Sequence, residues 1–458
     1  MASSLMLRLW SGREFIDRVA RHSPARLALG VFAGVIWIFT GLLSLPAATA
    51  SGERAPFIDA LFTATSAVCV TGLTTVPTGT FWSPFGQAVI LIGIKVGGLG
   101  VMTLASILGL AVSRRIGLTA KLLTASETKT TRLGEVGSLV RVVVIASTSI
   151  ELALALLLFP RFVYLNESIG QAVWHSVFYA ISAFNNAGFI PTAEGLVPHY
   201  NDWMLLVPIM LGMFIGALGF PVILNIARQR RRFSRWNLHA KLTVVTSALL
   251  VAIAWVWYLA AEWTNPLTLG PMAWPEKVLS AAFLGVMPRS GGLSTIDING
   301  LHEASWLITD AMMFVGGGSA STAGGIKVST LAVLMLAILA EARGDKDVDS
   351  FGRRIPRDTL RQAVAVTFVG ATIVLVASLI LLEITGFTLD VILFEVISAF
   401  ATVGLSTGIT ASIPTTGQYV LVVLMFVGRV GTMTLGAALA LRSRRRVIRL
   451  PEERPVIG

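Results

Sequence analysis

Residues 399–408 read AFATVGLSTG, and three other stretches of the chain are variants of the same short text. The variants are AVCVTGLTTV at 67–76, AFNNAGFIPT at 183–192 and VMPRSGGLST at 286–295. Aligned on the glycine that precedes Leu or Phe, the key positions are Gly72, Gly188, Gly292 and Gly404. A second glycine cluster follows each of them at a similar distance inside an apolar run, beginning at Gly97, Gly216, Gly316 and Gly428. Two landmarks in the same register, four times over, indicate a fourfold internal repeat.

The composition is typical of a polytopic membrane protein. Of the 458 residues, 54% are hydrophobic and 13% are charged, and the mean hydropathy is +0.76, which lies outside the range of soluble domains. A single cysteine, Cys69, excludes an internal disulfide, and the five scattered histidines argue against a metal site built on histidine. The first 26 residues do not resemble a cleavable secretion signal. They are either a cytoplasmic amphipathic arm on the membrane face or a disordered basic tail.

Apolar runs long enough to cross a bilayer, about 20 residues each, predict eight spans. The runs lie near residues 27–46, 86–112, 142–160, 203–226, 242–262, 305–338, 364–384 and 418–441. Most Lys and Arg residues fall in the two termini and in the loops 113–141, 227–241 and 339–363, whereas the other loops hold only Arg54, Arg161, Lys277 and Arg289. The positive-inside rule therefore places both termini in the cytoplasm. The net charge of +11 reflects this topology, so no nucleic-acid partner is expected.

Each repeat is predicted to contain an outward span, an outer segment and an inward span. The outer segments include short runs with helical apolar spacing at 57–69, 171–185, 276–288 and 389–402. These runs are too short to cross a bilayer, and each leads into its glycine text, so we interpret them as re-entrant pore helices that return as extended chain. The domain boundaries that follow are an arm at 1–26, repeats at 27–112, 142–226, 242–338 and 364–441, and a tail at 442–458. The alternative is that the glycines are ordinary turn residues of outer loops.

Glycine suits such a return because it adopts positive φ without a Cβ clash, so that backbone carbonyls can replace the hydration shell of a small cation. The predicted ion-binding residues are Val70, Thr71, Gly72, Asn186, Ala187, Gly188, Ser290, Gly291, Gly292, Thr402, Val403 and Gly404. None of them is acidic, which favours a monovalent ion over calcium. Acidic residues of the outer loops either concentrate cations at the mouth or are ordinary solvated charges; these residues are Glu53, Asp59, Glu167, Glu194, Asp297, Glu303 and Asp390.

The third inward span, MFVGGGSASTAGGIKVST at 313–330, holds too many glycines for a uniform helix, since each costs roughly 1 kcal/mol there. We predict a broken helix with a mobile gating loop, and the alternative is close packing of small residues. The gating residues are Gly316, Gly317, Gly318, Ser319, Thr322, Gly324, Gly325 and, in the last span, Arg429. A charge in mid-span must face water, an acid or carbonyls. Arg429 therefore either faces the pore or pairs with Glu151 or Glu395, and the role of Lys95 stays open.

The texts CVTGL, FNNAGF, SGGLSTID and ATVGLST, with GGLGVMTL, STAGGIK and GRVGTMTL after them, closely resemble the Trk/Ktr/HKT superfamily of potassium transporters. The resemblance covers essentially the whole chain, and eight spans with the ending PEERPVIG are most like the Ktr membrane subunits of the KtrB type. It implies an all-α fold of four membrane-pore-membrane repeats around one central pore, with K+ at the filter carbonyls. It also implies a filter at the four key glycines, a gating loop at about 316–325 and a pore arginine at Arg429. One departure is Ser290-Gly291-Gly292-Leu293, where the family commonly has Thr-Ala-Gly-Phe.

The resemblance further implies a homodimer, with the tail resembling the dimer contact, resting on a cytosolic ring of KtrA-like nucleotide-binding subunits. Na+ is expected as an activator, and the location is a bacterial plasma (inner) membrane. The chain itself has no GxxxxGK[ST] nucleotide loop, so no organic cofactor is predicted. A carrier with inverted repeats is the first rival, but two spans plus one re-entrant segment keep every repeat in the same orientation. An enzyme is the second rival, and the chain offers no Ser/His/Asp, metal or paired-carboxylate constellation for it.

Overall fold

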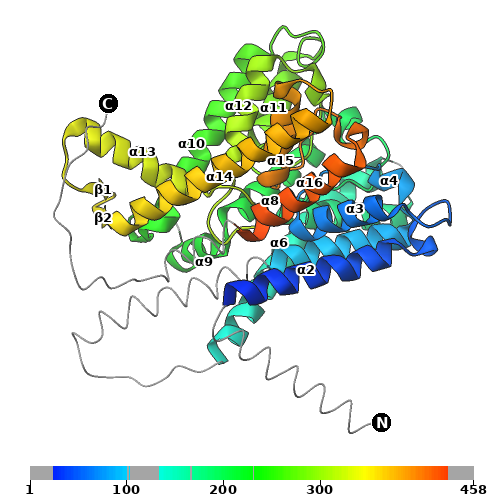
Figure 1. The fold of residues 1–458 in the computed structure, drawn as a ribbon, viewed down its shortest axis with the longest axis horizontal. Helices are drawn as coiled ribbons and strands as arrows, with labels where there is room; N and C mark the ends of the chain where they lie inside the picture. Colours follow the sequence, from blue (N-terminus) through cyan, green and yellow to red (C-terminus); the bar gives the residue numbers. More distant parts are fainter. Residues whose placement is uncertain (1–23, 101–102, 104–133, 166–167, 231, 432–458) are drawn as a thin grey trace.

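The computed structural model describes residues 24–100, 103, 134–165, 168–230 and 232–431, and it is mostly helical, as predicted (Figure 1). The first two quarters contain α2 (Pro24–Leu43), α3 (Phe57–Cys69), the short α4 (Thr78–Phe81), a helix over Pro84–Gly100, α6 (Gly134–Tyr164), α7 (Ile169–Asn185), α8 (Trp203–Leu218) and α9 (Phe220–Gln229). The last two contain α10 (Leu238–Ala261), α11 (Trp274–Val286), α12 (Glu303–Phe314), α13 (Val328–Arg343), α14 (Arg357–Ile384), α15 (Leu389–Phe400) and α16 (Thr415–Phe426), which a π-turn over Val427–Gly431 extends. A small antiparallel hairpin of β1 (Val348–Ser350) and β2 (Arg353–Ile355) joins α13 to α14.

Four short helices occupy the positions that the sequence predicts for pore helices. Helix α3 coincides with the predicted run, and α7, α11 and α15 begin and end within two residues of theirs. At α7, Ser168 accepts a hydrogen bond from the Gln171 N–H and Gln171 closes a capping box, which satisfies backbone donors that a helix start leaves free. The C-terminal half of every one of these helices is buried, so all four helices end inside the molecule.

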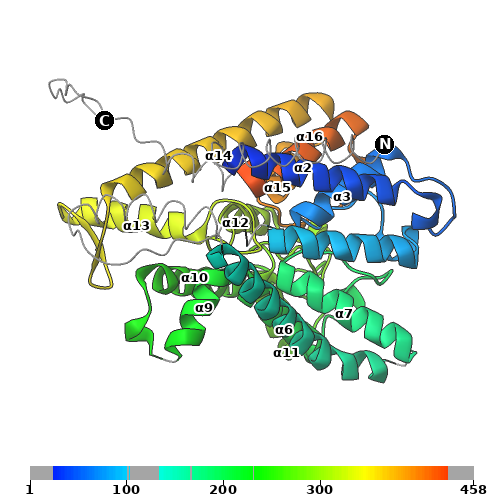
Figure 2. The same ribbon diagram turned by 90° about the horizontal axis from the view of Figure 1, so that it is seen from below.

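The chain closes on itself around these helix ends. Helix α8 packs against α11, α12 packs against α15, and α16 near the end of the chain packs against α3 near its beginning. Figure 2 shows α6 and α7 on one side, α14, α16 and α2 on the other, and α12 between them. The arrangement places the segments that follow α3, α7, α11 and α15 at the centre of the molecule.

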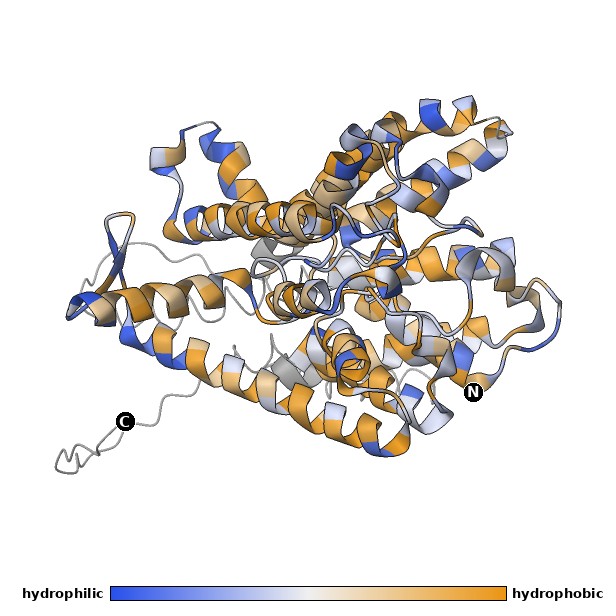
Figure 3. Ribbon diagram, turned by 90° about the horizontal axis from the view of Figure 1, so that it is seen from above, coloured by the Kyte–Doolittle hydropathy of each residue, from blue (hydrophilic) through white to orange (hydrophobic). Residues whose placement is uncertain are grey.

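Long apolar helices form the outside. Within the described residues, Val140–Tyr164, Leu238–Ala261 and Arg357–Ile384 are each long and apolar enough to cross a membrane. Their outward positions carry large hydrophobic side chains, including Leu156 on α6 and Phe368 on α14, which are 64% and 73% exposed, and Figure 3 shows hydrophobic colour along these outer helices. An exposed apolar surface of this extent is typical of contact with lipid. The predicted spans near 86–112 and 418–441 continue into residues outside those described.

The predicted span over 203–226 is wrong as a single helix. The chain bends by 98° between α8 and α9, and the bend lies at Gly219, whose φ is +91°. A Cβ at this position would lie 2.6 Å from the carbonyl oxygen of Ser319, so only glycine fits at the bend. Hydropathy alone did not reveal the bend because α8 and α9 together form one apolar run.

The stretch predicted as the third inward span is interrupted, as the glycine content predicts. Helix α12 ends at Phe314 and α13 begins at Val328, and residues 315–327 form a loop between them. The loop closes at its neck, where the Gly316 N–H donates to the Ile326 carbonyl at 2.8 Å. It packs against the α8–α9 bend, since the Gly318 N–H donates to the Ala217 carbonyl at 2.7 Å and the Phe220 N–H to the Ala320 carbonyl at 3.2 Å.

Candidate functional site

The four key glycines lie against one another in a closed ring. Gly72, Gly188, Gly292 and Gly404 all have positive φ, between +67° and +98°. A Cβ on Gly188 would lie 3.2 Å from the Cα atoms of both Gly72 and Gly292, and a Cβ on Gly404 would lie 3.0 Å from the Gly72 Cα and 3.2 Å from the Gly292 Cα. The order around the ring is therefore the order along the chain. A side chain at Gly72, Gly292 or Gly404 would overlap a neighbouring backbone, and one at Gly188 would press tightly against it.

One carbonyl oxygen from each repeat enters this ring. The oxygen of the residue before each glycine approaches the glycine of an adjacent repeat, within 2.3–3.3 Å of where a Cβ would stand. The pairs are Thr71 with Gly404, Ala187 with Gly72, Gly291 with Gly188 and Val403 with Gly292. Four backbone dipoles thus gather at one level, with no carboxylate among them, which is a donor set for a small monovalent cation.

The residues two places before the glycines are left-handed as well. Val70, Asn186, Ser290 and Thr402 have φ of 57°, 59°, 79° and 49°, a conformation that costs a residue with a side chain of order 1 kcal/mol or more. Helix ends stabilise it at all four positions, and in the third repeat the Gly291 N–H donates to the carbonyl of Met287 at the end of α11, at 2.7 Å. The N–H groups of Thr71, Ala187 and Val403 donate to helix carbonyls six residues upstream of each glycine, at 2.8–2.9 Å. We call residues 70–72, 186–188, 290–292 and 402–404 the glycine segments.

Serine hydroxyls add a second support in three repeats. The Gly72 N–H donates to Ser66 Oγ at 3.0 Å, and the Gly404 N–H donates to Ser398 Oγ at 3.1 Å. In the second repeat, Ser182 Oγ donates to the Phe189 carbonyl at 2.8 Å. The corresponding position of the third repeat is Val286, which has no hydroxyl, so the third glycine segment lacks this second support.

The third segment is held by Arg289 and Ser290. Ser290 Oγ donates to the Thr402 carbonyl of the fourth segment at 2.6 Å. Arg289 is only 3% exposed, and its guanidinium donates to the Ser247 carbonyl of α10 at 2.9 Å and to the Gly316 carbonyl at 3.3 Å. From the sequence Arg289 was predicted to be an outer-loop charge, and this role was missed. The available signal was a lone cation three residues before a key glycine, at the end of an apolar helical run.

The 315–327 loop lies against two of the glycine segments. Thr322 Oγ1 is 3.2 Å from the side-chain amide of Asn186 in the second segment. A Cβ on Gly324 would lie 2.1 Å from Thr402 Oγ1 in the fourth segment. All the predicted gating residues except Arg429 belong to this loop: Gly316, Gly317, Gly318, Ser319, Thr322, Gly324 and Gly325. Ser319 Oγ lies 3.1 Å from Ser329 Oγ in the first turn of α13.

Two further cations bind carbonyl oxygens of the same loop. Arg429, in the π-turn after α16 and 1% exposed, donates to the Thr322 carbonyl. Lys327 Nζ donates to the carbonyls of Ala323 at 2.6 Å and Gly324 at 3.3 Å. Arg429 and Arg289, which binds the Gly316 carbonyl, therefore hold the loop from outside, whereas Lys327 braces it from within.

Glu151 and Glu395, the predicted alternative partners of Arg429, form hydrogen bonds with other residues. Glu151 accepts from Lys95 Nζ at 2.5 Å and from the Asn185 amide at 2.8 Å, while Glu395 accepts from Ser406 at 2.9 Å and from Thr410. The alternative of an Arg429–carboxylate pair is thus wrong. Lys95 joins the first inward helix to α6, and through Glu151 it supports the residue next to the second glycine segment.

The acidic residues of the outer loops divide into bonded and exposed ones. Asp59 accepts from Thr75 Oγ1 at 2.6 Å, so it supports the turn after α3. Asp390 is exposed at the start of α15, and a hydrogen bond from the Thr388 side chain lowers the pKa of its carboxyl group. Glu167 lies outside the described residues. Among the residues that the structure describes, no cluster of three or more His, Cys, Asp or Glu side chains is present.

A ring of backbone carbonyls enclosed by helices whose outer faces are apolar defines a membrane protein that handles small cations. The family model for cation transport proteins of the TrkH type matches residues 34–444, and the chain belongs to this family. Its members are transport proteins, which confirms the prediction of a transporter rather than an enzyme.

Individual relatives agree over nearly the full length. The chain is 37% identical over 441 residues to the Ktr system potassium uptake protein B of Bacillus subtilis, covering 96% of this chain and 98% of the relative. It is 33% identical over 450 residues to the potassium/sodium uptake protein NtpJ of Enterococcus hirae, covering 96% and 98%. The crystal structure of the potassium transporter TrkH from Vibrio parahaemolyticus has a similar fold, with a TM-score of 0.67 at 17% identity over 89% of this chain and 84% of that one.

Proposed function

We propose that the chain is the pore-forming membrane subunit of a potassium-uptake system. The observation that carries the proposal is the ring of Gly72, Gly188, Gly292 and Gly404, with one carbonyl from each repeat beside it. Carbonyl oxygens arranged in this way replace the hydration shell of K+. The names of the relatives support potassium as the ion.

In this proposal α3, α7, α11 and α15 are re-entrant helices within four membrane-pore-membrane repeats, and the chain crosses the bilayer eight times with both termini in the cytoplasm. For the repeats we propose the boundaries that the sequence predicts; the predicted tail and most of the predicted arm lie outside the described residues. The glycine segments, each with the two residues before its glycine, form the filter. Most of the filter is backbone, so selectivity depends on how well the four segments hold their positions.

The 315–327 loop is the gate in this proposal, and Arg429 holds it beneath the filter. The support is the contact of Thr322 with Asn186 and of Gly324 with Thr402, together with the bond from Arg429 to the Thr322 carbonyl. A cationic guanidinium next to the path also opposes the entry of K+. Opening requires the loop to move away from the second and fourth segments.

The driving force is the membrane potential. One charge crossing 100 mV is worth about 2.3 kcal/mol, which supports accumulation of about fiftyfold. We further propose a homodimer that rests on a cytosolic ring of nucleotide-binding subunits and is activated by Na+, in a bacterial inner membrane. The Ktr names of the relatives support this assembly.

The first test is complementation of a potassium-uptake-deficient bacterium at low external K+. The second is rubidium and potassium uptake by the purified chain in proteoliposomes, with and without a regulatory subunit. We expect growth rescue, uptake driven by an inside-negative potential, and rates beyond roughly a thousand ions per second, because a pore does not need one conformational cycle per ion. Slower uptake that saturates at carrier rates would exclude a pore. Equal uptake of Na+ and K+ would exclude potassium selectivity.

A further inference from the structure

The third repeat differs from the others in the way that its glycine segment is attached. Ser66 and Ser398 tie the first and fourth segments to the helices that precede them, and Ser182 ties Phe189, directly after the second segment, in the same way. Val286 stands at this position in the third repeat and makes no such bond, so the bond from the Gly291 N–H to the Met287 carbonyl holds the third segment to its helix without a serine. A further attachment runs from the residue before this segment, Arg289, to α10 and to the neck of the 315–327 loop.

Arg289 reaches the loop at the point where its two ends meet. Gly316, whose carbonyl accepts from Arg289 Nη2, also pairs through its N–H with the carbonyl of Ile326. A shift of the loop neck therefore moves the acceptor of Arg289. The next residue, Ser290, donates to the Thr402 carbonyl, so a shift at Arg289 also affects the bond between the third and fourth glycine segments.

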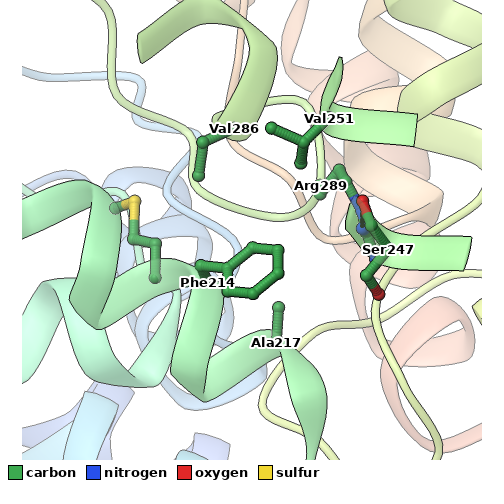
Figure 4. Close-up of a pocket in the computed structure, with 7 residues that line it drawn as sticks. Phe214, Ala217, Ser247, Val251, Val286 and Arg289 are labelled. Carbon is green, nitrogen blue, oxygen red and sulfur yellow. Dashed lines mark hydrogen bonds between the residues drawn. The ribbon is translucent and has the colours of Figure 1, made fainter. Parts of the chain in front are cut away.

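A small cavity lies beside the guanidinium. Figure 4 shows Arg289 and Ser247 together at one side of it, with Val286 and Val251 above and Phe214 and Ala217 below. The cavity volume is about 10 Å³, which is room for roughly one water molecule. Arg289 Nε and Ser247 Oγ are buried there without a partner in the described part of the chain. A single water in this cavity would satisfy both groups without any change in the packing around Arg289.

We propose that Arg289 is a positioning residue that couples the gate to the filter. With the 315–327 loop in place, Arg289 fixes both the loop neck and the third glycine segment. When the loop moves, the Arg289–Gly316 bond breaks, and the third segment, which has no serine support, loses this further attachment. The ion preference of the pore then depends on the state of the gate. The inference rests on the proposed function, because it assigns roles to the same filter and loop.

The test compares Arg289→Gln, Arg289→Lys and Arg429→Gln in the full-length protein in proteoliposomes, with the exposed Arg361→Gln on α14 as the control. The measurements are basal Rb+ uptake without a regulatory subunit, the K+/Na+ uptake ratio and the midpoint of thermal unfolding. We expect Arg429→Gln to raise basal uptake about tenfold and to lower the K+/Na+ ratio, because the released loop withdraws the Arg289 acceptor. Arg289→Gln should raise basal uptake about fivefold and lower the ratio severalfold.

The double variant Arg289→Gln/Arg429→Gln should lower the ratio no further than the larger single effect, since coupled residues are not additive. Arg289→Lys, which keeps the charge but reaches one carbonyl, should fall between the wild type and Arg289→Gln. An Arg289→Gln protein with the basal uptake and ratio of the wild type would overturn the proposal. A double variant whose K+/Na+ uptake ratio falls by the two single effects combined would also overturn the proposal.

Hydrogen exchange gives a readout that does not require the Arg289 variants to fold. In Arg429→Gln, exchange should rise in residues 316–325 and also in residues 287–293, but not in residues 70–73. A rise confined to 316–325 would overturn the coupling. If instead the folded wild type transports neither Rb+ nor K+, the proposed function fails, and this result is distinct from either outcome of the exchange experiment.

Discussion

The glycine segments and the 315–327 loop are neighbours with similar glycine-rich sequences, but different forces hold them in place. The segments are anchored by helix ends, by serine hydroxyls and by backbones in contact with one another. The loop is anchored by two arginine side chains that bind its carbonyls and by hydrogen bonds to the α8–α9 bend, and Lys327 braces it internally. The segments are therefore fixed by close-packed backbone, whereas the loop is released when a few long side chains move.

The largest expected effect is at the ring itself. Gly404→Ala places a methyl group 2.3 Å from the position of the Thr71 oxygen, which no small adjustment relieves because the neighbour is backbone. We expect Rb+ uptake to fall at least a thousandfold, equivalent to about 4 kcal/mol. Gly408→Ala is the matched control, since Gly408 has φ +92° but nothing within 4 Å of a Cβ. It should keep uptake within about threefold and lose about 1 kcal/mol of stability. Similar uptake in the two variants would contradict the close-packed ring.

The second effect concerns the buried pair that supports the second segment. Lys95→Met leaves Glu151 without its cation in a site where the carboxylate side chain is 6% exposed, and we expect a loss of about 3 kcal/mol in stability. Thermal unfolding in detergent measures it. The double variant Lys95→Met/Glu151→Gln should recover most of the loss, because the remaining groups are neutral. A double variant as unstable as the single one would show that the pair is not the source.

The third effect is at the loop. Arg429→Ala removes the donor to the Thr322 carbonyl, and a hydrogen bond from a charged group is worth about 1.5–3 kcal/mol. We expect basal Rb+ uptake without a regulatory subunit to rise at least tenfold. Arg343→Ala, at the exposed end of α13, should leave uptake unchanged. If Arg429→Ala inserts and folds but has wild-type basal uptake, Arg429 does not hold the gate.

The smallest effect concerns the serine supports. Ser398→Ala removes the acceptor for the Gly404 N–H, a neutral hydrogen bond worth about 1 kcal/mol. We expect the K+/Na+ uptake ratio to fall about threefold, with basal uptake in the absence of a regulatory subunit as low as in the wild type, because Ser398 makes no bond to the loop. Ser398→Thr keeps the hydroxyl and serves as the control. A rise in basal uptake in Ser398→Ala would show that the serine supports also hold the loop closed, and it would contradict the separate anchoring of the two regions.

Sequence patterns predicted the short helices and the broken span well, and they failed where burial decided the outcome. The helices follow from apolar spacing next to a glycine text, and the break follows from five glycines within ten residues, so both are local properties. The bend at Gly219 was missed because hydropathy does not register it, although Gly219 with its positive φ and Pro221 in the first turn of α9 are local helix breakers. Arg289 was misread because a cation in an outer loop and a cation buried against two carbonyls have the same sequence.

The chain by itself determined a mostly helical membrane protein with a repeated glycine text, because hydropathy, charge placement and backbone preference act over a few residues at a time. Only the tertiary structure decided which glycines touch, that Glu151 pairs with Lys95 and not with Arg429, and that Arg289 joins the third segment to the loop. Such choices depend on which groups share a buried space, since an unpaired polar group or charge there is costly and takes whichever partner the packing brings near.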